Sequence, residues 1–175
     1  FINIGRMTDQ KDQILLLKAF NNVKDKLKFK LIIIGKGKNK DLLKKYIIEN
    51  NLNNNIKIIN YKKNPYPYLN KADFFILSSK YEGLPNVLLE AQFLKKPIIS
   101  SNCPTGPREI LINGKAGFLF DVGNIQQLEK KIIFISQKKN SKLLKLKCNL
   151  GFQSMYRFDY NVNMKKYYKL VNRFL

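Results

Sequence analysis

The chain lacks His and Trp altogether and has only two cysteines, Cys103 and Cys148, among its 175 residues. The absence of His excludes a histidine acid, base or activated nucleophile within this segment. Two cysteines fit a reducing compartment, and no spacing of side chains resembles a metal site. We therefore expect neither a metal nor another cofactor.

Acidic residues are scarce. The chain has 12 Asp and Glu but 33 Lys and Arg, which gives a formal charge of +21. Such an excess raises nucleic acid or an anionic membrane as a partner. The cations are nearly all Lys, however, and they do not cluster with aromatic side chains as a base-stacking surface requires. We expect no nucleic-acid partner, whereas peripheral contact with an anionic membrane stays open.

No apolar run is long enough to span a membrane, and no signal peptide is present. We expect a cytoplasmic location, with the inner face of the membrane as an alternative. The first residues, Phe1-Ile2-Asn3-Ile4, have the pattern of a strand and include no initiator Met, which predicts a piece of a longer polypeptide. The length fits one domain, residues 1–175, with a substantial core.

Apolar runs of strand length alternate with amphipathic segments along most of the chain. The expected strands are residues 1–4, 30–34, 56–59, 73–77, 97–101 and 117–120. The expected helices between them are residues 12–27, 40–51, 65–71, 85–94 and 108–112, followed by a helical tail, about 124–175, with helices near 125–136, 141–152 and 161–174. Strands that alternate with helices predict an α/β fold, a doubly wound, Rossmann-like parallel sheet of about six strands.

Polar groups follow the strands at their carboxyl ends, where such sheets bind ligands. They include Arg6, the Gly35-Lys36-Gly37 turn, Asn60-Tyr61-Lys62, Glu82-Gly83 and the segment from Cys103 to Glu109. Five loops that converge on one edge are a stronger indication than any single motif. We predict the functional site at that edge.

The segment Ser78-Ser79-Lys80-Tyr81-Glu82-Gly83-Leu84-Pro85-Asn86-Val87-Leu88-Leu89-Glu90-Ala91 places two carboxylates eight positions apart across a turn that opens a helix. Pro85 suits the first helical position, where its missing N–H costs nothing. A helix N-terminus favours an anion such as phosphate, and nearby carboxylates then accept hydrogen bonds from hydroxyls. Hydrogen-bond donors for a phosphate, placed beside hydrogen-bond acceptors for hydroxyls, fit a nucleotide-sugar. An acid/base pair for glycoside hydrolysis and two ordinary surface acids are the alternatives for Glu82 and Glu90.

Other residues at this edge have both a functional and a plain interpretation. Arg6 and Lys11 either bind a diphosphate or are two solvated cations. Tyr61 either borders a nucleobase or is a surface tyrosine. Weaker candidates are Gly35 and Gly37, which either bring backbone close to a ligand or form a turn, and Glu109, which either contacts the sugar or acceptor or favours a helix dipole.

These residues together resemble the carboxyl-terminal domain of the family-4 retaining glycosyltransferases, which have the two-domain GT-B fold. The resemblance runs from Ile4 to about Asp121. It is carried by Gly-Arg-x4-Lys (Gly5 to Lys11), Ala72-Asp73, Glu-x7-Glu (Glu82 to Glu90) and Gly114-x2-Gly117. The runs Asn64-Pro65-Tyr66-x-Tyr68-Leu69 and Gly106-Pro107-Arg108-Glu109-Ile110-Leu111 are similar to members that build bacterial cell-surface glycans such as lipopolysaccharide.

The resemblance implies a role for each matching position. Arg6 and Lys11 would bind the donor diphosphate with the helix N-terminus, Glu90 would hold the ribose, and Glu82 would contact the transferred sugar. The residues expected to bind the donor nucleotide are thus Arg6, Lys11, Tyr61, Glu82, Gly83, Leu84, Pro85, Asn86, Val87 and Glu90, with Arg6, Lys11 and Glu82 as the catalytic set.

The implied reaction is transfer of a hexose or N-acetylhexosamine from a nucleotide-sugar donor, with retention, to a lipid-linked or oligosaccharide acceptor. The acceptor domain would precede this segment, so the segment alone would bind donor and turn over little. A related GT-B epimerase or sugar-phosphate synthase is one alternative. A non-enzymatic basic module that binds membranes or nucleic acid is an alternative of another class.

Overall fold

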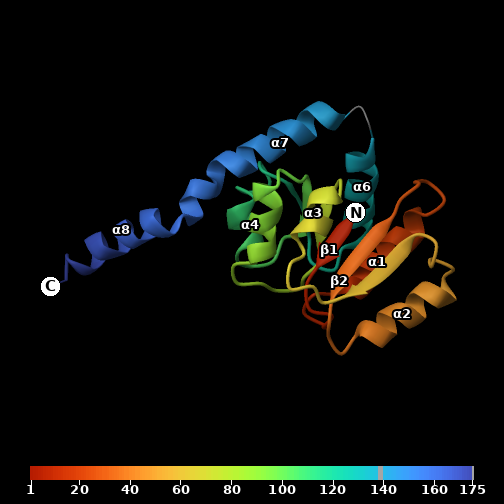
Figure 1. Ribbon diagram of the computed structural model, residues 1–175. Coiled ribbons are helices and arrows are strands. Elements are labelled where there is room, and N and C mark those ends of the chain that lie inside the picture. Colours follow the sequence, from red (N-terminus) through yellow and green to blue (C-terminus); the bar gives the residue numbers. More distant parts are fainter. Residues whose placement is uncertain (138–139, 175) are drawn as a thin grey trace.

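The computed structural model describes residues 1–137 and 140–174, and within them the strands form one parallel sheet of six strands in the order β3-β2-β1-β4-β5-β6 (Figure 1). The strands are β1 Ile2–Ile4, β2 Leu31–Gly35, β3 Ile56–Asn60, β4 Phe75–Leu77, β5 Ile98–Ser101 and β6 Phe118–Phe120. Every neighbouring pair is parallel. This confirms the predicted Rossmann-like α/β fold.

Helices cover both faces of the sheet, which is why its strands are mostly apolar. The helices between strands and directly after the sheet are α1 Gln13–Val23, α2 Lys40–Glu49, α3 Tyr66–Lys71, α4 Asn86–Phe93, α5 Pro107–Ile110 and α6 Ile125–Ser136. One face packs a cluster that includes Phe20 of α1 and Ile132 of α6. The other packs a cluster that includes Leu69 of α3, Leu88 of α4 and Ile110 of α5.

The strand order reverses at β1, which pairs with β2 on one side and β4 on the other. In a doubly wound sheet such a switch point leaves a crevice at the carboxyl ends of the two central strands. The loops that follow β1 and β4 therefore face each other there.

Several predicted boundaries were wrong by a few residues. Asp12 adopts a left-handed conformation with φ 46°, so α1 begins one residue later, and it ends at Val23. Pro85 is not the first helical residue: it is extended with ψ 96° and stands before α4, which begins at Asn86. Its carbonyl accepts the Leu88 N–H at 2.9 Å, so Pro85 supplies the first acceptor of the helix.

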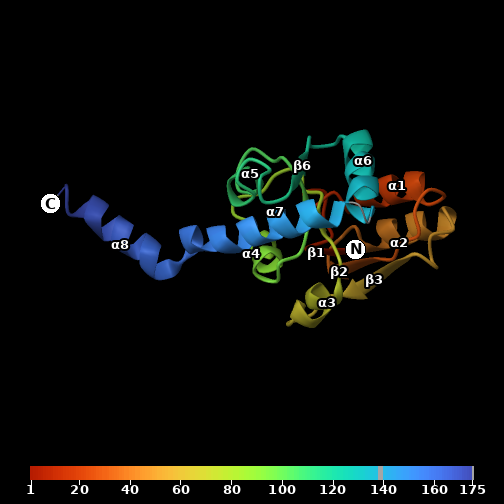
Figure 2. The same ribbon diagram turned by 90° about the horizontal axis from the view of Figure 1, so that it is seen from above.

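The predicted helical tail is present where the structure describes it, as α6, α7 Ser141–Gln153, a 3-10 turn Ser154–Phe158 and α8 Tyr160–Val171. Residues 138, 139 and 175 of the predicted tail lie outside the described residues. Lys147 Nζ donates to the carbonyl of Gly114 at 2.6 Å, and the Arg157 guanidinium donates to that of Glu109 at 3.2 Å. These bonds fasten α7 and the turn to the sheet domain, whereas α8 extends away from it (Figures 1 and 2).

None of the helices within residues 1–137 and 140–174 combines the length and the apolar character needed to cross a membrane. Both cysteines are buried and free.

Candidate functional site

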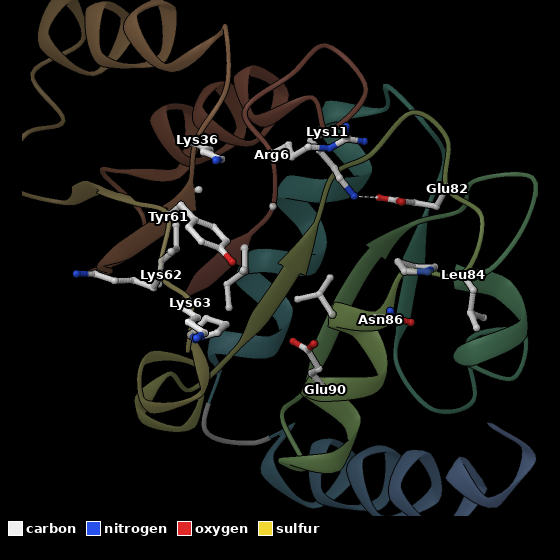
Figure 3. Close-up of a pocket in the computed structure, with 17 residues that line it drawn as sticks. Arg6, Lys11, Lys36, Tyr61, Lys62, Lys63, Glu82, Leu84, Asn86 and Glu90 are labelled. Carbon is white, nitrogen blue, oxygen red and sulfur yellow. Dashed lines mark hydrogen bonds and ion pairs between the residues drawn. The ribbon is translucent and has the colours of Figure 1, made fainter. Parts of the chain in front are cut away.

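A cavity of about 710 Å³ opens at the carboxyl edge of the sheet, beside the switch point (Figure 3). Its walls come from the loops after β1, β2, β3 and β4 and from the first turns of α4. The lining residues are Ile4, Gly5, Arg6, Lys11, Ile34, Gly35, Lys36, Tyr61, Lys62, Lys63, Pro65, Glu82, Leu84, Pro85, Asn86, Val87 and Glu90.

This cavity gathers most of the side chains that the sequence singled out. It contains Arg6, Lys11, Gly35, Tyr61, Glu82, Leu84, Pro85, Asn86, Val87 and Glu90. Three other candidates, Gly37, Gly83 and Glu109, are not among its lining residues. Glu109 is exposed on α5, and its carbonyl accepts the Arg157 guanidinium. The structure thus brings the charged set together and leaves Glu109 apart from it.

Glu82 and Lys11 form an ion pair at one side of the cavity. Lys11 Nζ lies 2.5 Å from Glu82 Oε1, and the side chains are only 14% and 7% exposed. The Ser78 hydroxyl donates to the Lys11 carbonyl at 2.8 Å, which ties the backbone of the loop after β1 to the end of β4. Because the ammonium carries three donors, Lys11 has capacity for a second anion while it is paired.

Glu90 lies on α4 at another side of the cavity, with its carboxylate directed into the open space (Figure 3). Burial raises the pKa of Glu90, and a hydrogen bond with the Tyr66 side chain lowers it in part. The negative charge of Glu90 in turn raises the pKa of the Tyr66 hydroxyl. A half-buried carboxylate that faces a cavity is suited to accept hydrogen bonds from a ligand's hydroxyls.

The start of α4 offers unpaired backbone donors to the same cavity. The N–H groups of Asn86 and Val87 have no hydrogen-bond partner among the described residues, and Pro85 before them has no N–H at all. Free donors and the positive end of the helix dipole together favour an anion at this point. No acidic residue occupies the first turn to compete for it.

Arg6 is exposed in the loop after β1, and Gln10 holds it against the opposite loop. Arg6 Nη2 donates to Gln10 Oε1 at 3.3 Å, while Gln10 Nε2 donates to the Tyr81 carbonyl at 3.0 Å. Figure 3 shows Arg6 beside Lys11, near the Glu82 side of the cavity. The two cations therefore share one wall with the acid.

The strand-end rule named Lys36 and Lys62 among the polar groups at this edge, without giving either a role in binding, and both line the cavity. It did not name Lys63 and Pro65, which line the cavity as well. Lys36 Nζ lies 5.4 Å from the Tyr61 ring centroid, a cation–π contact between two residues that line the cavity. Nothing local marks Lys63 and Pro65, which line the cavity because the chain turns into α3 there.

Gly35 and Gly37 are explained by backbone packing. A Cβ on Gly35 would overlap the carbonyl oxygen of Gly5, and one on Gly37 would overlap that of Met7. Both glycines let the loops after β1 and β2 lie against each other. Gly106, with φ 76°, packs in the same way on the Gly83 carbonyl and so supports the loop that carries Glu82.

No group of three or more Cys, Asp or Glu that could hold a metal ion occurs within residues 1–137 and 140–174. The charged side chains that line the cavity are two carboxylates, Glu82 and Glu90, and five cations, Arg6, Lys11, Lys36, Lys62 and Lys63.

A six-stranded Rossmann-like sheet with a charged cavity at its switch point defines a class of α/β domains that bind ligands at the strand ends. Within that class, the family model for glycosyl transferases group 1 matches residues 1–149, and the chain belongs to this family. Its relatives include bacterial cell-surface polysaccharide glycosyltransferases.

Two curated relatives illustrate the similarity. An uncharacterized glycosyltransferase of Methanocaldococcus jannaschii is 47% identical over 112 residues, which cover 63% of this chain and 28% of the relative. The N-acetylgalactosamine-N,N'-diacetylbacillosaminyl-diphospho-undecaprenol 4-alpha-N-acetylgalactosaminyltransferase of Campylobacter jejuni is 33% identical over 123 residues, 70% of this chain and 33% of the relative. The chain thus spans about a third of the length of these relatives.

Solved structures agree with the fold. TarM of S. aureus, solved as a mutant in complex with UDP and alpha-GlcNAc-glycerol, has a TM-score of 0.87 and 25% identity, covering 98% of this chain and 35% of that one. HepE of Anabaena, solved with UDP, has a TM-score of 0.83 and 22% identity, covering 98% and 48%. Both matches cover nearly all of this chain but less than half of the neighbour, which agrees with the fold of one GT-B half.

Proposed function

We propose that this chain is the donor-binding part of a retaining glycosyltransferase that uses a UDP-hexose or UDP-N-acetylhexosamine. The observation that carries the proposal is the division of charge within one cavity. Arg6, Lys11 and the free N–H groups of α4 provide donors for a diphosphate, while Glu82 and Glu90 provide acceptors for hydroxyls. A nucleotide-sugar presents these two kinds of group in one molecule.

In the proposed reaction, the protein's main task is to stabilise the diphosphate as it leaves the sugar. Negative charge grows on the diphosphate oxygens when the bond to the anomeric carbon breaks. Arg6, Lys11 and the N–H groups of Asn86 and Val87 are fixed before the reaction, so they stabilise this charge without reorganisation. Side-chain cations fill the electrostatic role that a metal has in other transferases.

The carboxylates would set the pose of the donor. Glu90 would accept both hydroxyls of the ribose, and Glu82 would accept a hydroxyl of the transferred sugar. Tyr61, an exposed side chain that lines the cavity, would border the base. Such a pose places the bond to be broken beside the cationic wall.

The acceptor half and the stereochemistry are proposed on the likeness to the family. We propose that a preceding domain binds a lipid-linked or oligosaccharide acceptor in cell-surface glycan synthesis, that transfer retains configuration, and that this chain alone turns over little. The name of the Campylobacter jejuni relative, which includes diphospho-undecaprenol, supports a lipid-linked acceptor. A peripheral position at an anionic membrane is part of the same proposal.

Calorimetric titration of the chain with UDP-, GDP- and ADP-sugars tests the donor assignment. We expect saturable binding of one molecule per chain, tightest for the UDP-sugars. The presence of UDP in the TarM structure supports that order. A chain that binds none of the three nucleotides would contradict the proposal. Product analysis on the full-length protein separates a transferase from a GT-B epimerase or a sugar-phosphate synthase.

A further inference from the structure

Ser79 is a fully buried serine two residues after the end of β4, and it contacts Glu82 without lining the cavity. It is 0% exposed, and the lining residues do not include it. Its hydroxyl donates to Glu82 Oε1 at 2.5 Å. The same oxygen accepts Lys11 Nζ at 2.5 Å, so a single carboxylate oxygen takes two short hydrogen bonds.

The position of Ser79 is itself fixed by the neighbouring strand. Its carbonyl accepts the Ser101 hydroxyl at 2.6 Å and the Cys103 thiol at 3.0 Å. The backbone of Glu82 is held from the same side, because the Thr105 hydroxyl donates to the Glu82 carbonyl. Ser79 is therefore held in a fixed position by β5 and the residues after it, and from there it positions the Glu82 side chain.

These contacts leave the two oxygens of Glu82 in different states. Oε1 has two donors, whereas Oε2 has none among the described residues. The last torsion of a Glu side chain has a broad energy profile, so with Lys11 as its only donor the plane of the carboxylate could turn about that torsion. The Ser79 hydroxyl is a second donor that fixes this plane, and with it the place of the oxygen that has no donor.

We infer that Ser79 is a positioning residue: with Lys11 it occupies Oε1 of Glu82 and reserves Oε2 for one hydroxyl of the transferred sugar. This inference rests on the proposed function. A single oxygen in a fixed place distinguishes sugars that differ in configuration at one carbon, because only one epimer brings its hydroxyl within reach. Ser79 thus acts on sugar selectivity without touching the donor.

The test measures affinities of this chain for UDP, UDP-glucose, UDP-galactose and the two N-acetylated counterparts by calorimetry. We expect the unaltered chain to prefer one epimer of a pair. Ser79→Ala should keep the affinity for UDP within about twofold and reduce the epimer preference about tenfold, the scale of one charge-assisted hydrogen bond. Ser100→Ala is the matched control, since Ser100 is equally buried and donates only to the Ser101 carbonyl.

A double-mutant cycle separates positioning from a general effect on the fold. Glu82→Gln should reduce the epimer preference, and adding Ser79→Ala to it should reduce it no further. Additive losses, or an unaltered preference in Ser79→Ala, would overturn the inference. So would equal affinities of the unaltered chain for both epimers.

A joint loss of UDP affinity and melting temperature in Ser79→Ala, but not in Ser100→Ala, would assign Ser79 a structural role instead. Failure of the unaltered chain to bind UDP would overturn the proposed function itself.

Discussion

Glu90 is the residue whose environment predicts the clearest dependence of nucleotide-sugar affinity on pH. Burial raises its pKa, so it loses its charge at a higher pH than an ordinary Glu. If Glu90 accepts the ribose hydroxyls as a carboxylate, affinity for UDP-glucose should fall as the pH is lowered from about 7.5 towards 5. The diphosphate of UDP-glucose is fully substituted and stays ionised, so it does not contribute to this change.

Calorimetry across that pH range checks the expectation. Glu90→Gln should bind more weakly at neutral pH and show a flatter pH profile. Glu49→Gln, an exposed acid on α2 that pairs with Lys45, should keep the profile of the unaltered chain. An identical pH profile in the Glu90 variant would show that another group is responsible.

A substitution of Arg6 tests whether this residue contacts the diphosphate or the base and ribose of the nucleotide. Arg6→Ala should weaken the binding of UDP by about 1.5–3 kcal/mol, the scale of hydrogen bonds to a charged group, and weaken that of uridine much less. Arg173→Ala on the tail removes the same charge outside the cavity and should leave both affinities unchanged. Equal losses for UDP and uridine in the Arg6 variant would refute its contact with the diphosphate.

At the scale of elements, the loop that carries Glu82 depends on its neighbour after β5. Gly106 has φ 76°, and a Cβ there would overlap the Gly83 carbonyl oxygen. Gly106→Ala should therefore destabilise the chain by more than the ~1–2 kcal/mol that a left-handed conformation costs a side chain. Gly123→Ala is the control, with φ 79° and nothing within 4 Å of its added Cβ.

Denaturant unfolding of both variants measures this difference. The Gly106 variant should also lose nucleotide affinity, because Glu82 moves with its loop, whereas the Gly123 variant should retain it. Equal unfolding free energies for the two variants would mean that the contact between the loops contributes nothing.

The sequence predicts most of the elements because their signals are local. Runs of apolar residues rich in Ile, such as Leu31–Gly35, identify the strands, and the strand-end rule identifies Arg6, Tyr61 and Glu82. The boundaries of α1 and α4 were less accurate because Asp12 and Pro85 take conformations that the surrounding loops impose.

Contacts between segments that are far apart in the chain could not be predicted from the sequence, for a different reason. The bond from Ser79 to Glu82 depends on β5, which holds Ser79 in place from more than twenty residues away. Glu109 was a candidate from its position in a strand-end loop, yet α5 places it outside the cavity. Gly37 was explained only when its packing on Met7 was visible.

At the scale of the whole molecule, the charge of +21 predicts how binding responds to salt. A nucleotide-sugar meets only the few cations of the cavity, so its affinity should fall modestly between low and high salt. A non-enzymatic basic module would instead bind polyanions with a steep dependence, because each neutralised phosphate releases a counterion. Titrations with UDP-glucose and with a DNA duplex at several salt concentrations compare the two slopes. Tight binding of the duplex with no saturable binding of UDP-glucose would favour the basic module.

The proposed function depends on one cavity in which cations bind a diphosphate while Glu90 binds the ribose. The most direct measurement is the affinity for UDP of the chain with Glu90→Ala, with Glu49→Ala as its matched control. We predict that UDP binding weakens by about 1.5–3 kcal/mol in the first variant and stays unchanged in the second. A correctly folded Glu90→Ala chain that binds UDP as tightly as the unaltered one would contradict the assignment of the site.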